Sequence, residues 1–262
     1  MWDDLFVREV DERRVQFVRA LDTDRPMWAA YQAGVYLGTV TAEPGSGRPL
    51  WRVLASGECY QVLDDAVRSL RRPASWPRER DQAARWARNL LADVSLAAVD
   101  IETTGLDNAF AVQIAVVTPG GTVLCNEYVR PDAVIEPDAV AVHGITPDRV
   151  VRAATFGELL PRLTRLLHGR TLVSCNAVFD RGVFERELTR HQGSTAQAAG
   201  WLARVRWEDA MTPYAAWHGL WSAKRGTYRN QPLGGPHDAV ADCHLLLAKL
   251  KKMAATVPPA RG

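Results

Sequence analysis

The pattern of apolar and polar positions divides the chain into two parts, and the second part has the clearer pattern. Its first three apolar runs predict strands, and the short turns between them favour an antiparallel meander: Leu96–Ile101, Phe110–Val117 and Thr122–Val129. Helical periodicity then alternates with short apolar runs, predicting helices at Thr155–His168, Phe179–His191 and His237–Lys252 and strands at Thr171–Cys175 and near Val205–Asp209. This order predicts an α/β fold, with a mixed five-stranded sheet flanked by helices.

The first part, residues 1–78, is predicted to form a small α+β accessory module of unknown role. Its opening segment, Trp2–Leu21, mixes apolar and charged residues in a way that fits a helix or a strand equally well. Two apolar stretches, WAAYQAGVYLGTV and LWRVLASGECYQV, flank the turn-rich EPGSGRP and predict strands. The following LDDAVRSLRRP predicts a helix that ends at proline.

This strand, strand, helix pattern is weakly similar to the sheet-plus-helix arms of some DNA-binding proteins, in which aromatic and arginine side chains reach a groove. The favoured alternative is that the aromatic residues form the core of a small sheet: Trp28, Tyr31, Trp51 and Tyr60. Arg71–Pro77 is predicted as the linker to a second domain, residues 79–254, which starts with an amphipathic helix at Arg80–Ala92. Residues 255–262 are predicted as a frayed tail.

The composition predicts an ordinary soluble protein. Hydrophobic residues make up 47% of the chain, and the net charge of +2 excludes a global polycation, so nucleic-acid binding would need a local patch. The four cysteines form no Cys-x-x-Cys pair, which argues against a zinc or redox motif. The N-terminus is acidic and without an apolar signal segment, and no stretch approaches the length of a membrane span, so we expect a cytoplasmic protein.

The segment VDIETTGL ends an apolar run with two carboxylates, Asp100 and Glu102. Residues i and i+2 on a strand point to the same face, and burying two like charges side by side is costly unless a cation neutralises them. The pair therefore predicts half of a divalent-metal site. Three further segments follow in order: VHGIT at 142–146, NAVFD at 176–180 and HDAVAD at 237–242.

Together these four segments resemble the DEDDh exonucleases of the DnaQ-like family, which includes polymerase proofreading subunits. The resemblance implies an RNase H-like fold and assigns the catalytic residues by motif: Asp100 and Glu102 to the first, Asp180 to the second, His237 and Asp242 to the third. It implies that the four acids bind two divalent ions, Mg²⁺ or Mn²⁺, and that His237 is the general base. A histidine five residues before Asp242 selects this branch over the related one that uses tyrosine with a four-residue spacing.

The resemblance also assigns residues to binding of the terminal nucleotide: Thr103, Thr104, Gly105, Leu106, His143, Gly144, Ile145, Asn176 and Phe179. The turn at 103–106 is expected to receive the 3′ end, with backbone amides meeting the sugar and the leucine packing against the base. For His143 the alternative interpretation is a loop histidine that is hydrogen-bonded to the backbone.

The expected function is that of a metal-dependent 3′–5′ exonuclease acting on single-stranded 3′ ends, with DNA favoured over RNA. A stand-alone enzyme is favoured over a polymerase subunit, because little chain follows the last predicted helix. Dimers occur among similar exonucleases, although the residues show no interface signature. The alternative function is a catalytically silent nucleic-acid-binding or scaffold protein acting through the N-terminal module. A third hypothesis is a nuclease that this module directs to defence or to mobile elements.

Overall fold

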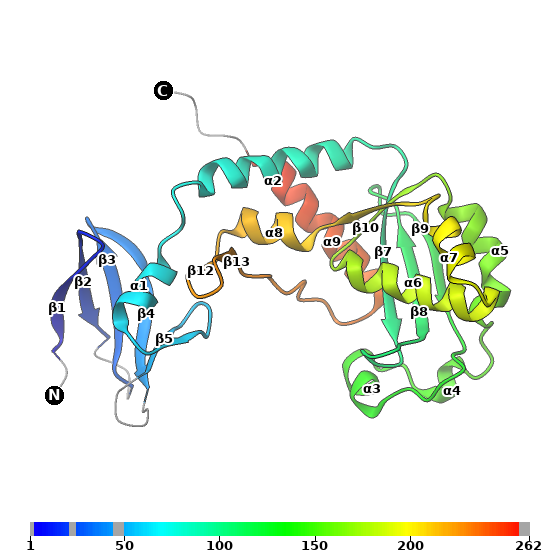
Figure 1. Cartoon of the computed structure of the whole chain (residues 1–262), viewed down its shortest axis with the longest axis horizontal. Coiled ribbons are helices and arrows are strands. Elements are labelled where there is room, and N and C mark those ends of the chain that lie inside the picture. The colour runs from blue at the N-terminus through cyan, green and yellow to red at the C-terminus, as the bar shows by residue number, and fades with distance from the viewer. Residues whose placement is uncertain (1–2, 21–24, 44–49, 257–262) are drawn as a thin grey trace. The chain divides into compact units, whose positions relative to one another are not determined.

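The computed structural model describes residues 3–20, 25–43 and 50–256. The chain forms two compact units (Figure 1): the N-terminal unit, Met1–Arg80 with His218–Arg229, and the C-terminal unit, Asp81–Trp217 with Asn230–Gly262. The chain therefore passes from one unit to the other three times. Residues 44–49 of the predicted turn and residues 257–262 of the predicted tail lie outside the described ranges.

The C-terminal unit is built on a mixed five-stranded sheet with the strand order β11-β10-β7-β8-β9. Strand β8 pairs antiparallel with β7 and β9, whereas β10 pairs parallel with β7 and β11. The strands are β7 (Leu96–Thr103), β8 (Ala111–Val117), β9 (Val123–Tyr128), β10 (Thr171–Ser174) and β11 (Arg206–Asp209). The predicted α/β fold with its five-stranded sheet is confirmed.

Helices cover both faces of this sheet (Figure 1). One hydrophobic core joins the sheet to α5, α6 and α7, and a second joins its other face to α2 and α9. The helices are α2 (Trp76–Leu91), α3 (Pro137–His143), α4 (Pro147–Val150), α5 (Phe156–Leu167), α6 (Ala177–Gln192), α7 (Thr195–Leu202), α8 (Met211–His218) and α9 (Ala239–Ala254). Short α3 and α4, which the apolar pattern did not indicate, enclose a small core of their own against β8.

Strand β7 is buried along both faces, and its alternation places the two acids. Ala97, Val99 and Ile101 belong to the core beneath α5 and α6, whereas Leu96 and Ala98 belong to the core beneath α9. Because side chains alternate along a strand, positions 100 and 102 continue the row that starts at Leu96. The carboxylates of this strand therefore follow the apolar row that packs against α9.

The N-terminal unit contains a six-stranded antiparallel sheet, in the order β1 to β6, packed against the short helix α1. Its elements are β1 (Leu5–Val10), β2 (Arg13–Arg19), β3 (Met27–Gln32), β4 (Val35–Glu43), β5 (Leu50–Val53), β6 (Cys59–Tyr60) and α1 (Leu63–Leu70). Trp28, Trp51 and Tyr60 are buried in its core, with the two tryptophan rings 5.6 Å apart. The core interpretation of these aromatic residues is confirmed, while Tyr31 is only half-buried.

The sequence prediction of this unit contained too few strands. The opening segment forms the β1–β2 hairpin, and the stretch predicted as a single strand folds back on itself as β3 and β4. Both hairpins turn on residues with positive φ: Asp11 (53°) and Glu12 (59°) in the first, Ala33 (49°) and Gly34 (77°) in the second. Two successive positive φ angles match the twist of a two-residue hairpin turn.

A short hairpin from late in the sequence belongs to the N-terminal unit. Its strands are β12 (Trp221–Ser222) and β13 (Thr227–Tyr228). Glu58 anchors it, because its carboxylate pairs with Arg229 at 2.9 Å and accepts a hydrogen bond from the Ser222 hydroxyl at 2.9 Å. The sequence pattern did not separate this segment from the second domain. Across the described residues, no helix is long and apolar enough to cross a membrane.

Candidate active site

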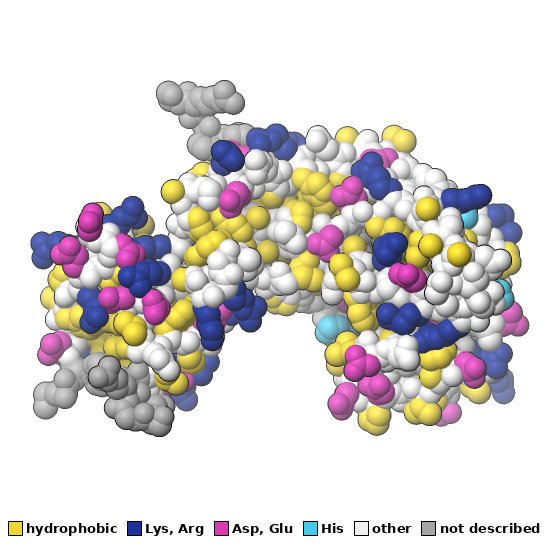
Figure 2. Space-filling model, in the orientation of Figure 1, with side chains coloured by type: hydrophobic (Ala, Val, Ile, Leu, Met, Phe, Trp, Pro, Cys, Tyr) yellow, Lys and Arg dark blue, Asp and Glu magenta, His cyan; other side chains and the backbone are white. Residues whose placement is uncertain are grey.

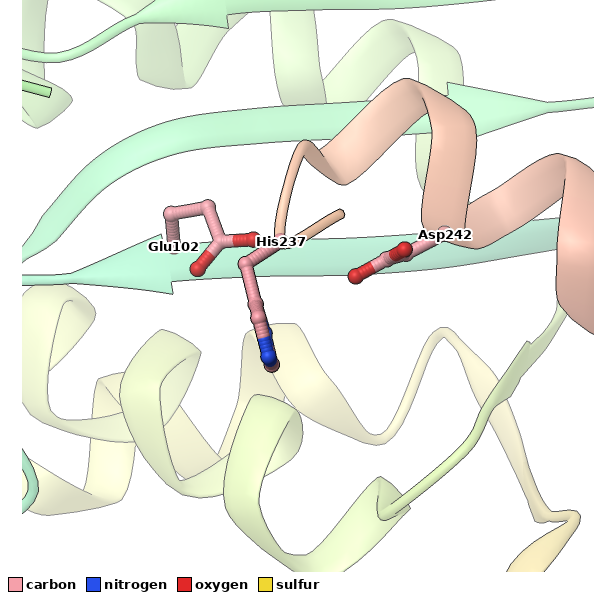
Figure 3. Close-up of side chains that lie close together, drawn as sticks. All are labelled: Glu102, His237 and Asp242. Carbon is pink, nitrogen blue, oxygen red and sulfur yellow. The ribbon is translucent and has the colours of Figure 1, made fainter. Parts of the chain in front are cut away.

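Three predicted site residues meet at the end of β7. Glu102, His237 and Asp242 each offer a ligand atom, and these atoms lie within 4.8 Å of one another. Figure 3 shows their origins: Glu102 comes from β7, Asp242 from α9 and His237 from the segment just before that helix. The two carboxylates are buried, whereas the imidazole is exposed. The cluster therefore has two buried acidic groups and one histidine that is open to solvent.

The N-terminus of α9 sets the position of His237. Asp238 is the N-cap residue, and its Oδ1 accepts a hydrogen bond from the amide of Ala241 at 3.0 Å. The helix therefore begins at Ala239, and the prediction that it begins at His237 is wrong. His237 instead adopts a left-handed backbone conformation with φ of 55°, so it lies outside the right-handed helix.

Half-buried Asp100 and buried Asp180 add two carboxylates to this acidic environment. Burial and the charges of Asp180, Glu102 and Asp242 raise the pKa of Asp100 well above its usual range. Burial raises the pKa of Asp180 to about 7, although the Ser174 hydroxyl donates a hydrogen bond to its carboxylate. Burial and the neighbouring acids likewise raise the pKa of Glu102 to about 7, and burial raises the pKa of Asp242.

The donor set fits divalent cations. Oδ1 of Asp242 is buried and has no hydrogen-bond partner among the described residues, and unpaired buried polar atoms are costly. All four acids offer oxygen atoms, the ligands preferred by Mg²⁺ and Mn²⁺. A cation would stabilise the ionised forms that burial disfavours.

The model of the Exonuclease family (RNase T) matches residues 97–250, which include these five side chains. The chain belongs to this exonuclease family. The resemblance to DnaQ-like exonucleases and the RNase H-like fold are thereby confirmed.

Similar proteins include phage, bacterial and mouse members. An uncharacterized exonuclease of Escherichia phage 186 is 28% identical over 169 residues, 60% of this chain and 86% of the phage protein. The mouse interferon-stimulated gene 20 kDa protein is 28% identical over 120 residues, 45% of this chain and 39% of the mouse protein. The DNA polymerase III subunit epsilon of Escherichia coli is 34% identical over 62 residues, 24% of this chain and 26% of that subunit.

Solved structures of exonucleases are similar at lower identity. Exonuclease X in complex with 5′ overhanging duplex DNA has a TM-score of 0.38 and 24% identity, with 60% of this chain and 90% of that chain covered. The nuclease domain of 3′hExo, a DEDDh family member bound to rAMP, has a TM-score of 0.40 and 14% identity, with the same coverage of 60% and 90%.

The turn at 103–106 of this exonuclease domain is held by its own hydroxyl groups. Thr103 Oγ donates to the carbonyl of Gly105 at 2.6 Å, and Thr104 Oγ accepts from the amide of Phe110 at 3.0 Å. Leu106 is 80% exposed. An exposed leucine side chain beside a hydrogen-bonded turn is compatible with the predicted contact to a base. That contact stays a prediction.

His143 lies at the end of α3 and is bonded to the backbone on both sides of its ring. Its Nδ1 accepts from the amide of Ile145 at 3.0 Å, so Nε2 carries the proton and faces the carbonyl oxygen of Thr103 at 3.0 Å. The structure thus shows His143 hydrogen-bonded to the backbone. One of its two partners, Thr103, belongs to the predicted turn at 103–106. Gly144 follows in a left-handed conformation with φ of 71°.

Three other residues predicted to bind the terminal nucleotide lie in apolar cores or at a helix end. Ile145 is buried in the small core with Val112. Phe179 packs against the core between the sheet and α6, and Asn176 is the N-cap residue of α6 without a side-chain cap bond. Contact of any of these with a nucleotide stays a prediction.

Sequence reasoning missed Gln113, which lies opposite Glu102 in the β7–β8 register. Its side chain is buried and its Nε2 donates to Oδ1 of Asn126 at 3.0 Å and to Oδ2 of Asp238 at 3.4 Å. Its Oε1 accepts from the amide of Ala239 at 3.4 Å. Gln113 therefore connects the central sheet to the first residues of α9. The available signal was a lone polar residue in the apolar run AVQIAVV.

Proposed function

We propose that this protein is a metal-dependent 3′–5′ exonuclease that removes nucleotides from single-stranded nucleic acid, with DNA favoured over RNA. One observation carries the proposal: four carboxylates with raised pKa values are gathered at the end of β7, next to an exposed histidine. Such a cluster is costly in a protein that does not bind cations.

The reaction proposed for this site is hydrolysis of the terminal phosphodiester. A water oxygen attacks phosphorus, the bond to the 3′ oxygen of the preceding nucleotide breaks, and a nucleoside 5′-monophosphate leaves. Two bound divalent ions would supply positive charge for the attacking and leaving oxygens. Asp100, Glu102, Asp180 and Asp242 would hold these ions, with Ser174 fixing the carboxylate of Asp180.

His237 is proposed to take the proton from the attacking water. Its ring is exposed while the neighbouring carboxylates are buried, so it can exchange protons with solvent between turnovers. Histidine suits this role because its charge changes near neutral pH. The turn at 103–106 lies next to the acids along the chain, and its hydrogen-bonded backbone supports an end-binding role. The preference for DNA is supported by the similarity to a DNA polymerase subunit.

A degradation assay on matched DNA and RNA oligonucleotides tests the proposal. With Mg²⁺ or Mn²⁺, a 5′-labelled strand should shorten progressively from its 3′ end, and a chelator should stop the reaction. His237→Ala and Asp100→Asn should each lose activity by at least about 10²-fold, whereas His244→Ala, an exposed histidine on α9, serves as the matched control. Cleavage of a circular single strand would contradict the exonuclease assignment. Unchanged activity in Asp100→Asn would contradict the assigned site.

A further inference from the structure

The N-terminal unit contains a groove of about 690 Å³. Its walls come from the start of β2, the start of β4, the end of α1 and the first residues of the segment His218–Arg229. The feature therefore lies entirely within one compact unit. On the face shown in Figure 2, acidic and basic side chains are intermixed over this unit, so any charge preference must be local.

The lining of this groove is positive. It includes Arg13, Arg71, Arg72 and His218, and no aspartate or glutamate is among its described lining residues. Asp11 is not a lining residue, but its carboxylate pairs with Arg71 of the groove at 3.1 Å and with Arg68 at 2.8 Å. Arg13, Arg72 and His218 remain besides this pair, and a concave surface with an excess of basic groups attracts anions.

Two of the arginines are fixed by the protein itself. Arg71 donates to the carbonyl of Val10 at 2.9 Å and to Oε1 of Gln32 at 3.0 Å. Arg72 donates to the carbonyl of Gly219 at 3.2 Å and lies 4.1 Å from the centre of the Trp76 ring. Guanidinium groups held in place before a ligand arrives lose little side-chain entropy when it binds.

The third arginine and Tyr36 are more exposed, although the Tyr36 ring lies 5.6 Å from that of Tyr31 and its hydroxyl is 2.7 Å from Oγ1 of Thr39. Arg13 is exposed and forms no ion pair within the described ranges. Tyr36 also lines the groove and is 55% exposed, and Trp221 is half-buried on the opposite segment. Exposed aromatic rings beside arginines are what single-stranded nucleic acid requires, because bases stack on the rings while phosphates meet the cations.

We infer that this groove binds a stretch of single-stranded nucleic acid, with the arginines facing phosphates and Tyr36 stacking on a base. The inference rests on the proposed function in that the bound strand is the substrate of the exonuclease domain. An acidic peptide would match the charge of the groove, but its carboxylates offer no base that could stack on the exposed ring of Tyr36. The N-terminal unit is thus a substrate-holding module, and its contribution grows with strand length.

Binding is tested on the full chain by fluorescence anisotropy with a labelled 20-nucleotide single strand, in chelator so that no cleavage occurs. Tyr36→Ser should weaken binding by about tenfold, the effect of losing one stacked base. Arg13→Gln should lower the slope of log affinity against log salt by about 0.7, as expected for one lost phosphate contact on a single strand. Arg14→Gln is the matched control, because the adjacent exposed arginine points to the other face of β2 and does not line the groove.

A second substrate separates this inference from the proposed function. The p-nitrophenyl ester of thymidine 5′-monophosphate carries a single nucleotide and no strand for the groove to hold, so Arg13→Gln and Tyr36→Ser should hydrolyse it at the wild-type rate. If wild type fails to hydrolyse this ester and every oligonucleotide, the proposed function is wrong, while salt-dependent binding would still support the groove. Equal binding of the 20-mer by wild type and both variants would overturn the inference. Competition by polyglutamate as effective as that by an unlabelled strand would overturn it as well.

Discussion

Gly235 lies so close to Asp242 that a Cβ atom at residue 235 would be 1.6 Å from Oδ1 of the aspartate. No real side chain can occupy that space, because the atom in conflict belongs to a buried carboxylate at the candidate site. The glycine therefore permits the segment before α9 to pass over Asp242 and deliver His237 beside it. The neighbouring Gly234 serves a different purpose, since its φ of 77° is a conformation that glycine adopts most readily.

Gly235→Ala should reduce exonuclease activity by roughly 10²-fold, the cost of misplacing a catalytic group by about 1 Å. The added methyl group must displace Asp242, His237 or both. The measurement is the kcat/KM for a short single strand at saturating Mn²⁺. Gly200→Ala is the control, because that glycine has open space around its Cβ position. Wild-type activity in Gly235→Ala would show that the observed approach to Asp242 is not needed in the working enzyme.

Gln113→Met should lower both stability and activity. The substitution keeps a similar volume but leaves the amide of Ala239 and the side chain of Asn126 without their present partners. We expect a loss of about 1–3 kcal/mol in the free energy of unfolding, measured by urea titration. We also expect a decrease in kcat that exceeds the change in KM, because the start of α9 loses its connection to the sheet. Gln197→Met, at an exposed position of α7, should change neither quantity, and an unchanged kcat in Gln113→Met would assign this residue to stability alone.

His143→Ala should raise KM for oligonucleotides by about tenfold with a smaller effect on kcat, since losing two hydrogen bonds loosens the turn at 103–106. Burial lowers the pKa of His143, so its ring is neutral at pH 7 and above. Its removal should therefore leave the shape of the pH–rate profile unchanged. Initial rates between pH 6 and 9 test this, and a loss of the ascending limb in His143→Ala would instead make His143 a proton-transfer residue.

Strand β7 shows how much of the site could be predicted from the sequence. A continuous apolar run bounded by a Thr-Thr-Gly turn is a strong strand signal, and the two-residue period alone places Asp100 and Glu102 on one face. The start of α9 was harder, because His237 continues the polar pattern of the helix. The residue that decides the boundary is Asp238, a strong N-cap former whose bond to Ala241 the spacing did not reveal.

The N-terminal unit could be predicted less well for a physical reason. Its hairpins turn on Asp11–Glu12 and Ala33–Gly34, and Glu and Ala are residue types that seldom adopt positive φ, so neither pair gives a strong turn signal. The β12–β13 hairpin has only two residues per strand, too few for any periodicity. It joins this unit through Arg229 and Glu58, which are far apart in sequence, so no local pattern reports the contact.

The metal-free protein should become less stable as pH rises from about 4 to 7. Carboxyl groups have unfolded-state pKa values of about 4, whereas those of Glu102 and Asp180 are raised to about 7 in the fold. The folded state therefore binds more protons over that interval, and the stability that these protons contribute is fully present below about pH 4 and is lost as pH rises through 7. Thermal unfolding in chelator at pH 5.5 and pH 8.0 measures the effect.

Mn²⁺ should restore this lost stability, and it should do so more strongly at pH 8.0 than at pH 5.5. Protons compete with cations for the same oxygen atoms, so the increase in Tm on adding metal depends on pH. Asp180→Asn should reduce both the pH-dependent loss and the increase caused by metal, because it removes one buried charge without changing the size of the side chain. Asp148→Asn, an exposed acid on α4, is the matched control. If Asp180→Asn and wild type gain the same Tm from Mn²⁺ at pH 8.0, then Asp180 does not hold a cation.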